Sequence, residues 1–269
     1  MNVASLIAEV LAYKNPTLAP ASRRRYAAAA RGIAVSHLGS TDLASVTPMA
    51  VARYTSGMRA TPNAANHALT VLKIAFDWAL ERGLVLTNPA ASIKRHREAK
   101  RTRLLTPAEI DSVRTASGPQ LRLIIDLCVH TGQRVGDILA LTVDAVRQEG
   151  LLVRASKTGK ALIVGWTPAL STIVAEAQAL PCHERLLGAA GVAAPLYNTV
   201  LKRWLRACEA SGVRDAHIHD LRAYAATVAD RQGLDATALL GHSSPAVTAR
   251  YLRDRAPRVV AGPMLTMAA

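Results

Sequence analysis

The chain has 269 residues, of which 33 are Lys or Arg and 19 are Asp or Glu, giving a formal charge of +14 at pH 7. With 50% apolar and only 19% charged residues, most of the chain is expected to fold, which excludes intrinsic disorder as its general state. This length fits two small domains, and the excess of positive charge favours a nucleic acid as partner.

No secretory or membrane segment is expected. The opening stretch MNVASLIAEVLAYK carries an acid inside its apolar run and has no basic segment ahead of it. The longest weakly charged run, 161–175, is interrupted by glycine and proline and is too short to cross a bilayer. The three cysteines are far apart and form no Cys-x-x-Cys pair, which fits a reducing compartment such as the cytoplasm.

The first part of the chain is predicted to be a small domain of four helices. The apolar spacing covers Val3–Tyr13, Ser22–His37, Pro48–Met58 and Ala64–Arg82. Near the start of the second helix, three adjacent arginines offer donors and charge to DNA phosphates, namely Arg23, Arg24 and Arg25. Neighbouring positions point in different directions around a helix, so at least one of the three is expected to be ordinary solvated surface.

A basic run, 94–103, follows this domain and is predicted to be a linker. The first 103 residues contain 15 Lys or Arg and 5 Asp or Glu, so they hold +10 of the +14. The residues of the run expected to contact the DNA backbone are Lys94, Arg95, Lys100, Arg101 and Arg103. The alternative is a merely solvated loop. The run ends at Thr106-Pro107-Ala108-Glu109, which is typical of a capping box at a helix start.

The second half is predicted to be mainly helical with one β-hairpin. Helical spacing extends from Glu109 to Val129, breaks at Thr131-Gly132-Gln133 and resumes over Val135–Leu141. Two short apolar runs, 151–155 and 161–164, flank the segment SKTGK and predict a hairpin with lysines at its tip. From Pro168 onward the chain is expected to be helical again.

Five local patterns in this half point together to phosphate chemistry. In chain order they are TGQRVGD with Arg134, SKTGK with Lys157, HDLR with His219 and Arg222, LGHSS with His242, and ARY with Tyr251. Each pattern is weak alone. Cleaving a phosphodiester needs charge at the non-bridging oxygens, a nucleophile and a proton donor for the leaving oxygen, and this set contains all three.

In order and spacing, these residues resemble the tyrosine recombinase (phage integrase) family, most of all its lambda-type phage integrases. The resemblance covers about Thr106 to Tyr251, and the upstream helices are similar to the family's core-binding domain. It implies a mainly α fold, with a helical SAM-like core-binding domain, 1–93, and an α-rich catalytic domain with a small antiparallel sheet, 104–269. It also implies an enzyme, a DNA strand transferase that cuts and rejoins DNA through a 3'-phosphotyrosyl intermediate and needs no cofactor.

The resemblance gives each candidate a role. Arg134 and Arg222 clamp the scissile phosphate, a task for which forked guanidinium donors are suited. His219 binds the phosphate and helps to deprotonate the nucleophile, Tyr251. By the same resemblance, His242 donates to that phosphate from the start of a helix.

Lys157 is the expected general acid for the leaving oxygen. Lys160 competes for that role, and its alternative is a contact to the DNA backbone. Asp137 resembles the family's acidic residue that orients the site, and its alternative is an ion pair with Arg134 three residues earlier. No metal is expected, because His217-x-His219 has no further ligands at zinc spacing, and SKTGK lacks the preceding glycine of a P-loop.

The resemblance further implies double-stranded DNA as substrate, a homotetramer on two DNA sites, and room for an accessory DNA-bending or directionality protein. The tail Arg258–Ala269 resembles segments that dock on a neighbouring protomer, with a frayed terminus as the alternative. Because the first helix begins near Met1, we expect either a simpler recombinase without an arm-binding domain or a preceding segment. Two other functions stay open: a Xer-like resolvase, and a DNA-binding protein on this fold that does not cleave.

Overall fold

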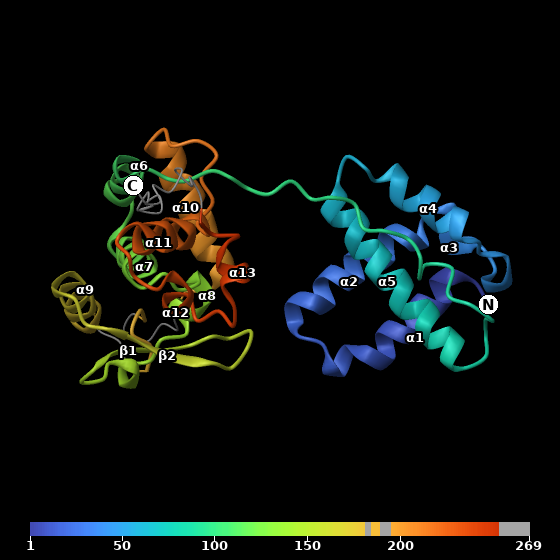
Figure 1. Ribbon diagram of the computed structural model, residues 1–269, viewed down its shortest axis with the longest axis horizontal. Coiled ribbons are helices and arrows are strands. Elements are labelled where there is room, and N and C mark those ends of the chain that lie inside the picture. Colours follow the sequence, from blue (N-terminus) through green and yellow to red (C-terminus); the bar gives the residue numbers. More distant parts are fainter. Residues whose placement is uncertain (181–183, 189–194, 253–269) are drawn as a thin grey trace, which may run out of the picture. The chain divides into compact units, whose positions relative to one another are not determined.

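The computed structural model describes residues 1–180, 184–188 and 195–252. The chain divides into two compact units, Met1–Ala99 and Lys100–Ala269 (Figure 1). This division falls inside the segment 94–103 that we predict to be the linker. The tail Arg258–Ala269, for which docking on a neighbouring protomer and a frayed terminus are both open, lies outside the described residues.

The first unit is entirely helical in its regular structure. Its elements are α1 (Val3–Lys14), α2 (Pro20–Ala34), α3 (His37–Ser40), α4 (Pro48–Gly57) and α5 (Pro62–Glu81), with two short 3-10 turns, η1 (Asn15–Thr17) and η2 (Leu43–Ser45). Three of these helices begin with proline, whose fixed φ and missing N–H suit the first helical position. The four predicted helices are present, and the single turn α3 is an addition.

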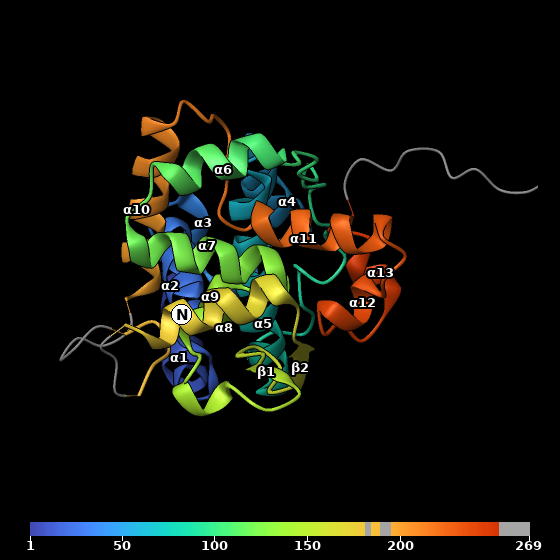
Figure 2. The same ribbon diagram turned by 90° about the vertical axis from the view of Figure 1, so that its left-hand side faces the viewer.

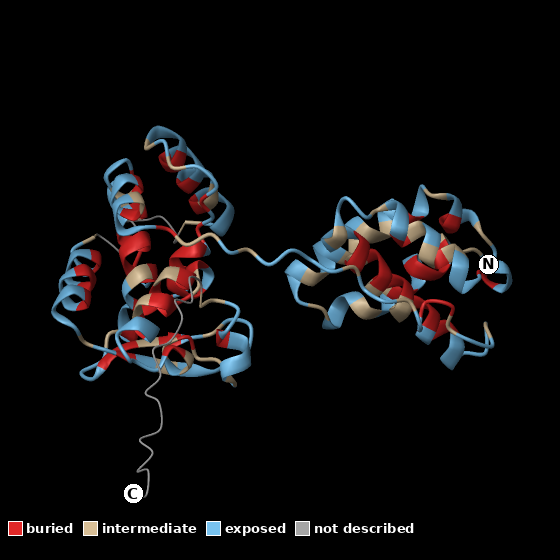
Figure 3. Cartoon of the chain, turned by 45° about the horizontal axis from the view of Figure 1, so that its top comes forward, coloured by how far each residue is buried: buried red, intermediate tan, exposed pale blue. Residues whose placement is uncertain are grey.

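The core of the first unit forms around α5. This helix has ten buried residues, including Leu72 and Phe76, and both α1 and α2 pack against it. Figure 3 shows the buried positions along the inner side of α5 and the exposed ones on the outer faces of its neighbours. From α1, the buried side chains Leu6 and Ile7 complete the same cluster. Burial of the fourteen aliphatic and aromatic side chains larger than alanine in this cluster is the main stabilising contribution here, at roughly 1.5–3 kcal/mol for each large one.

The second unit is an α-helical assembly with one hairpin. Its elements are α6 (Pro107–Thr115), α7 (Pro119–Thr131), α8 (Val135–Leu139), the 3-10 turn η3 (Val143–Ala145), β1 (Gly150–Arg154), β2 (Ala161–Gly165), α9 (Pro168–Gln178), α10 (Tyr197–Ala210), α11 (Asp220–Arg231), α12 (Ala236–Leu239) and α13 (Pro245–Thr248). Helix α11 packs along α7, and α12 and α13 follow it at one end of this unit (Figure 2). A mainly α fold with a small antiparallel sheet is thus confirmed.

The segment predicted as one continuous helix over Glu109–Val129 is two helices, so this prediction was wrong. The chain turns between α6 and α7 at Ser117-Gly118, and Pro119 opens α7. Proline lacks the N–H that a continuing helix requires, and the residue before it avoids the helical region. The capping box at the start of α6 is confirmed, with Thr106 and Glu109 each bonding to the other's backbone N–H.

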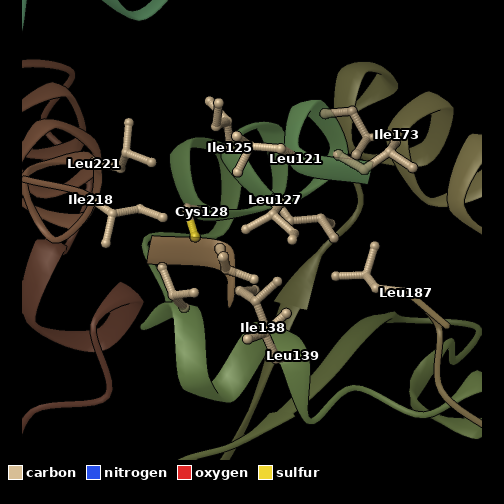
Figure 4. Close-up of a cluster of buried hydrophobic side chains, with 14 of the residues drawn as sticks. Leu121, Ile125, Leu127, Cys128, Ile138, Leu139, Ile173, Leu187, Ile218 and Leu221 are labelled. Carbon is tan, nitrogen blue, oxygen red and sulfur yellow. The ribbon is translucent and has the colours of Figure 1, made fainter. Parts of the chain in front are cut away.

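Helix α7 lies at the centre of the second core. Figure 4 shows Ile125, Leu127 and Cys128 of this helix beside Ile138 and Leu139 of α8, all within one buried cluster. Burial raises the pKa of the Cys128 thiol to about 12, so this thiol stays protonated and unreactive at neutral pH. The polar ends of α7 and α11 are therefore held in place by a packed apolar layer.

The predicted hairpin is confirmed. Strands β1 and β2 pair antiparallel, with Gly150 opposite Gly165 and Arg154 opposite Ala161. At the tip, the Ala155 N–H donates to the Lys160 carbonyl at 2.8 Å, and Gly159 adopts a φ of +71°, which glycine tolerates. Lys157 and Lys160 are both exposed at this tip.

Candidate active site

The corner between α7 and α8 presents Arg134. Helix α7 ends in the left-handed Gly132, at φ +67°, whose N–H donates to the Cys128 carbonyl at 3.0 Å. Arg134 is the N-cap residue of α8, and its side chain keeps 30% of its exposure. The glycine thus turns the chain so that the arginine stands at the rim of the domain rather than in its core.

Arg222, on α11, is the most constrained of the site residues. It is only 1% exposed, and its Nη1 donates to the Gly132 carbonyl at 2.6 Å while its Nη2 donates to the Leu240 carbonyl at 2.7 Å. Its buried Nε has no hydrogen-bond partner among the described residues. Burial, and then the charge of Arg134, lower the pKa of Arg222 to about 10. The guanidinium therefore remains charged at neutral pH.

His242 lies against Arg222 and Thr248. Its Nε2 is 3.0 Å from Arg222 Nη2, and its Nδ1 is 3.0 Å from Thr248 Oγ1. A guanidinium only donates, so Nε2 accepts and the ring proton sits on Nδ1. Burial, followed by the charges of Arg222 and Arg134, lowers the pKa of His242 to about 4. The ring is thus neutral near pH 7, and its Nε2 is an acceptor here rather than the phosphate donor that we expected.

Tyr251 lies three residues after the last residue of α13, Thr248. Its hydroxyl is 3.2 Å from His219 Nε2, and its ring centroid lies 5.2 Å from that of His242. The guanidinium carbon of Arg222 is 5.3 Å from the tyrosine ring centroid. His219 is the N-cap residue of α11, immediately ahead of the helix that carries Arg222. A phenol, an imidazole and a guanidinium therefore meet at one place.

The lysine hairpin is tied to this place through Asp137. The Asp137 carboxylate, 1% exposed, accepts from the Ser156 N–H at 2.9 Å through Oδ1, and its Oδ2 is 3.7 Å from Arg134 Nη1. The contact with Ser156 thus supports a role for Asp137 in orienting the site, and the approach to Arg134 supports the alternative of an ion pair. Among the described residues, no contact joins the ammonium of Lys157 or Lys160 to the other candidate side chains. The structure brings together five of the six catalytic candidates and leaves the sixth, Lys157, on a tethered turn.

The candidate DNA contacts of the first unit are exposed. Arg23 and Arg25 are partly used by their own backbone, since Arg23 Nε donates to the Leu18 carbonyl at 2.8 Å and Arg25 Nε donates to the Ala21 carbonyl at 3.2 Å. Arg24 is exposed between them. Of the candidates in the basic run, Lys94, Arg95 and Lys100 are exposed, and Arg95 also lies 4.0 Å from Glu98.

Arg101 and Arg103 are placed differently from the rest of the basic run. Arg101 Nε lies 2.9 and 3.0 Å from the two carboxylate oxygens of Asp220, and its Nη1 is 2.8 Å from Asp215 Oδ1. Arg103 pairs with Glu109 of α6. Both guanidiniums are engaged by carboxylates of their own unit, so the geometry favours internal ion pairs over DNA contacts at these two positions.

Two residues of the site have roles that no sequence pattern indicates. Asp220, 1% exposed, accepts hydrogen bonds from Arg101, which is 119 residues earlier in the chain, so no local pattern reveals this contact. Thr248 holds the ring of His242, and its only sequence signal is its place three residues before the tyrosine.

Within the described ranges, no group of three or more His, Cys, Asp or Glu side chains is arranged to hold a metal ion. In the same residues, no helix is long and apolar enough to cross a membrane.

The fold and the converging arginines, histidines and tyrosine define the class of tyrosine recombinases. The chain belongs to the phage integrase family, whose model matches residues 102–258. The integrase of Enterobacteria phage 434 is 30% identical over 236 residues, which cover 81% of this chain and 66% of that protein. The chain thus spans just under two thirds of this relative's own length.

Solved structures of lambda integrase share the fold. Lambda integrase bound to DNA aligns with a TM-score of 0.80 at 25% identity, over 95% of this chain and 96% of that one. A lambda integrase tetramer bound to a Holliday junction aligns with a TM-score of 0.85 at 23% identity, over 97% of this chain and 80% of that one.

Proposed function

We propose that this protein is a site-specific DNA recombinase that integrates or excises a phage or other mobile element. The observation that carries the proposal is the 3.2 Å approach of the Tyr251 hydroxyl to His219 Nε2 beside the charged Arg222. A phenol with a base within hydrogen-bond reach and a cation at its ring is a nucleophile prepared for attack on an electron-poor centre.

The reaction begins with attack of Tyr251 Oη on the scissile phosphorus. The phenol proton passes to His219 Nε2, a new P–O bond forms to the tyrosine, and the bond from phosphorus to the 5'-oxygen breaks. Lys157 gives its proton to that 5'-oxygen, so the products are a 3'-phosphotyrosyl protein and a free 5'-hydroxyl. Rejoining runs the same steps in reverse on a new 5'-hydroxyl, and the phosphodiester energy is kept in the covalent link.

Arg134 and Arg222 stabilise the extra negative charge on the non-bridging oxygens. Arg222 is held in advance by the Gly132 and Leu240 carbonyls, so it needs no reorganisation when the charge develops. The partly exposed Arg134 approaches the phosphate from the solvent side. The residues present supply nucleophile, base, acid and charge from protein groups.

The proposed partners are double-stranded DNA and further copies of this chain. Lambda integrase has been solved as a tetramer on a Holliday junction, and the family membership supports the same assembly here, a homotetramer on two DNA sites. An accessory DNA-bending or directionality protein is part of the proposal, and we place the reaction in the bacterial cytoplasm, where the DNA lies. A Xer-like resolvase would share this chemistry and differ in its DNA target.

The test is trapping of the covalent intermediate. A pool of duplexes with random core sequence, each nicked so that the released end is lost, is incubated with the protein and resolved on a denaturing gel. We expect a protein–DNA adduct whose recovered DNA shares one sequence, and we expect Tyr251→Phe to bind that DNA and form no adduct. Adduct formation by Tyr251→Phe at the wild-type level contradicts the proposed nucleophile, and binding without an adduct in the wild type points to a protein that does not cleave.

A further inference from the structure

Thr248 joins two groups of the site without belonging to any of the recognised patterns. It is 2% exposed at the end of α13, with its Oγ1 3.0 Å from His242 Nδ1. Its carbonyl accepts from the Tyr251 N–H at 2.7 Å. One residue therefore holds the ring of His242 by its side chain and the nucleophile segment by its backbone.

The hydrogen-bond directions around His242 are fixed by chemistry. In this structure Arg222 Nη2 donates to Nε2 at 3.0 Å, so the ring proton sits on Nδ1 and the Thr248 hydroxyl accepts the hydrogen bond from it. A phosphate oxygen in the site accepts hydrogen bonds only. For His242 to serve it, Nε2 must carry the proton, and Nδ1 then becomes an acceptor.

A hydroxyl group can serve both states because it donates or accepts by rotation about its C–O bond. We propose that Thr248 is a positioning residue whose hydroxyl supports both neutral tautomers of His242, one that accepts from Arg222 in the protein without DNA and one that donates to the phosphate in the complex with DNA. This inference rests on the proposed function. One proton leaves Nδ1 to solvent and one enters Nε2 from solvent, so the ring's proton count is unchanged.

The charged neighbours of the ring favour a neutral imidazole. Arg222 of α11 and Arg134 at the start of α8 both face it, and the ring of Tyr251 lies 5.2 Å away. Two nearby guanidiniums disfavour a third positive charge, which makes a change of tautomer the less costly way to present an Nε2–H. Control of a catalytic histidine by the hydrogen bond on its other nitrogen is a general device.

The kinetic test compares Thr248→Val with Thr248→Ser. Valine keeps the shape and removes the hydroxyl, so we expect the adduct to form about tenfold more slowly at saturating DNA, the rate equivalent of about one hydrogen bond. Serine keeps the hydroxyl and should restore the rate to within about twofold. The matched control is Thr55→Val, another buried threonine, at 1% exposure in the first unit, whose hydroxyl bonds only to backbone carbonyls of its own helix among the described contacts.

DNA binding and thermal unfolding are measured on all three variants, and Thr55→Val should cleave at the wild-type rate. Wild-type cleavage by Thr248→Val overturns the inference. Equal slowing of the valine and serine variants, with normal unfolding, also overturns it, because packing rather than the hydroxyl would then be the cause.

A spectroscopic readout tests the tautomers directly. In the protein labelled with ¹⁵N at histidine, the NMR signals of His242 should show a protonated Nδ1 and an unprotonated Nε2 in the absence of DNA. In the Tyr251→Phe protein bound to the recovered duplex, the proton should appear on Nε2. An unchanged tautomer on binding, or an Nε2–H in the free protein, contradicts the inference. If the wild type forms no adduct at all, the proposed function fails, while the signal of the free protein still reports on the bond between Thr248 and His242.

Discussion

Arg222 has two tasks at once. Its guanidinium bridges the Gly132 and Leu240 carbonyls, so it ties the end of α7 to the end of α12. It also faces Tyr251 and His242 as the buried cation of the site. Arg134, with 30% exposure and Asp137 at 3.7 Å, has a much smaller structural part. The two arginines should therefore respond differently to the same substitution.

We predict that Arg222→Lys loses both activity and stability. Lysine keeps the charge but lacks the two separate amino groups by which the guanidinium reaches both carbonyls. One of the two buried carbonyls is therefore left without its donor, at a cost of about 1–3 kcal/mol in the free energy of unfolding. The rate of adduct formation should fall about 10²–10³-fold, as for loss of a main transition-state donor. Urea unfolding and single-turnover cleavage measure the two effects.

The matched variant is Arg134→Lys. It should lose cleavage to a similar degree and change the free energy of unfolding by less than about 0.5 kcal/mol, because its partly exposed side chain donates to no buried carbonyl. If both variants are equally unstable, the structural task assigned to Arg222 is wrong.

At this scale the sequence could predict the residues that act by their type and order. Arginine, histidine and tyrosine in that arrangement are visible in one dimension, and five of the six candidates lie together in the structure. The hydrogen-bond directions could not be predicted. His242 accepts from Arg222, a residue 20 positions away in the chain, so no local pattern predicts this hydrogen bond. Thr248 is one buried threonine among several in the sequence, and only the structure shows that its hydroxyl contacts the ring of His242.

Among the elements, α6 shows how a local signal is strengthened by a distant one. Glu109 closes the capping box with Thr106 and also pairs with Arg103 of the preceding segment. The pairing with Arg103, and then the Thr106 N–H, lower the pKa of Glu109 to about 2. A carboxylate whose pKa is depressed in the folded state stabilises that state above its unfolded pKa, and the contribution disappears as the pH falls through the folded pKa.

We predict that Glu109→Gln weakens the start of α6 in a pH-dependent way. At pH 7 the free energy of local opening should fall by up to about 1 kcal/mol, the contribution of a partly solvated ion pair, since glutamine at 109 still accepts from the Thr106 N–H and keeps the capping box. The difference from the wild type should shrink between about pH 5 and pH 2, as the wild-type carboxylate takes up its proton. Hydrogen exchange of the α6 amides gives this difference, and a gap that is constant over the range would contradict the ion-pair contribution.

The element boundaries show where sequence patterns end. Proline starts, the capping box and the glycine-flanked hairpin are set by neighbours in the chain, and they were predictable. The apolar spacing continues in phase across the break between α6 and α7 and therefore predicts one helix, although Gly118-Pro119 is a local signal for the break. The direction that α7 takes after this break is set by its packing against α8, α9 and α11.

Over the whole molecule, the positive charge is divided into free and paired cations. Lys94 and Lys100 are exposed, whereas Arg101 and Arg103 are held by carboxylates of the second unit. Paired cations release few counterions on binding DNA, because their charge is already compensated. The basic run is therefore less basic towards DNA than its composition suggests.

We predict that Lys100→Gln and Arg103→Gln differ in the salt dependence of DNA binding. Both remove one positive charge, so they are matched in net charge. Lys100→Gln should make the negative slope of log K against log salt concentration shallower by about 0.9, the value for one phosphate contact. Arg103→Gln should leave the slope unchanged, and titrations of fluorescent duplex at several salt concentrations measure both. An equally weakened salt dependence in both variants would mean that the ion pair does not withdraw Arg103 from the DNA.

The tether of the lysine hairpin also bears on which substitutions the chain can accept. Asp137 holds the turn through the main-chain N–H of Ser156 and not through its side chain. A main-chain donor is present in every residue except proline, so position 156 can drift in sequence without releasing the hairpin. The acceptor has no such freedom, since only a carboxylate at 137 reaches both the hairpin and Arg134. The contact is thus constrained on one side and permissive on the other.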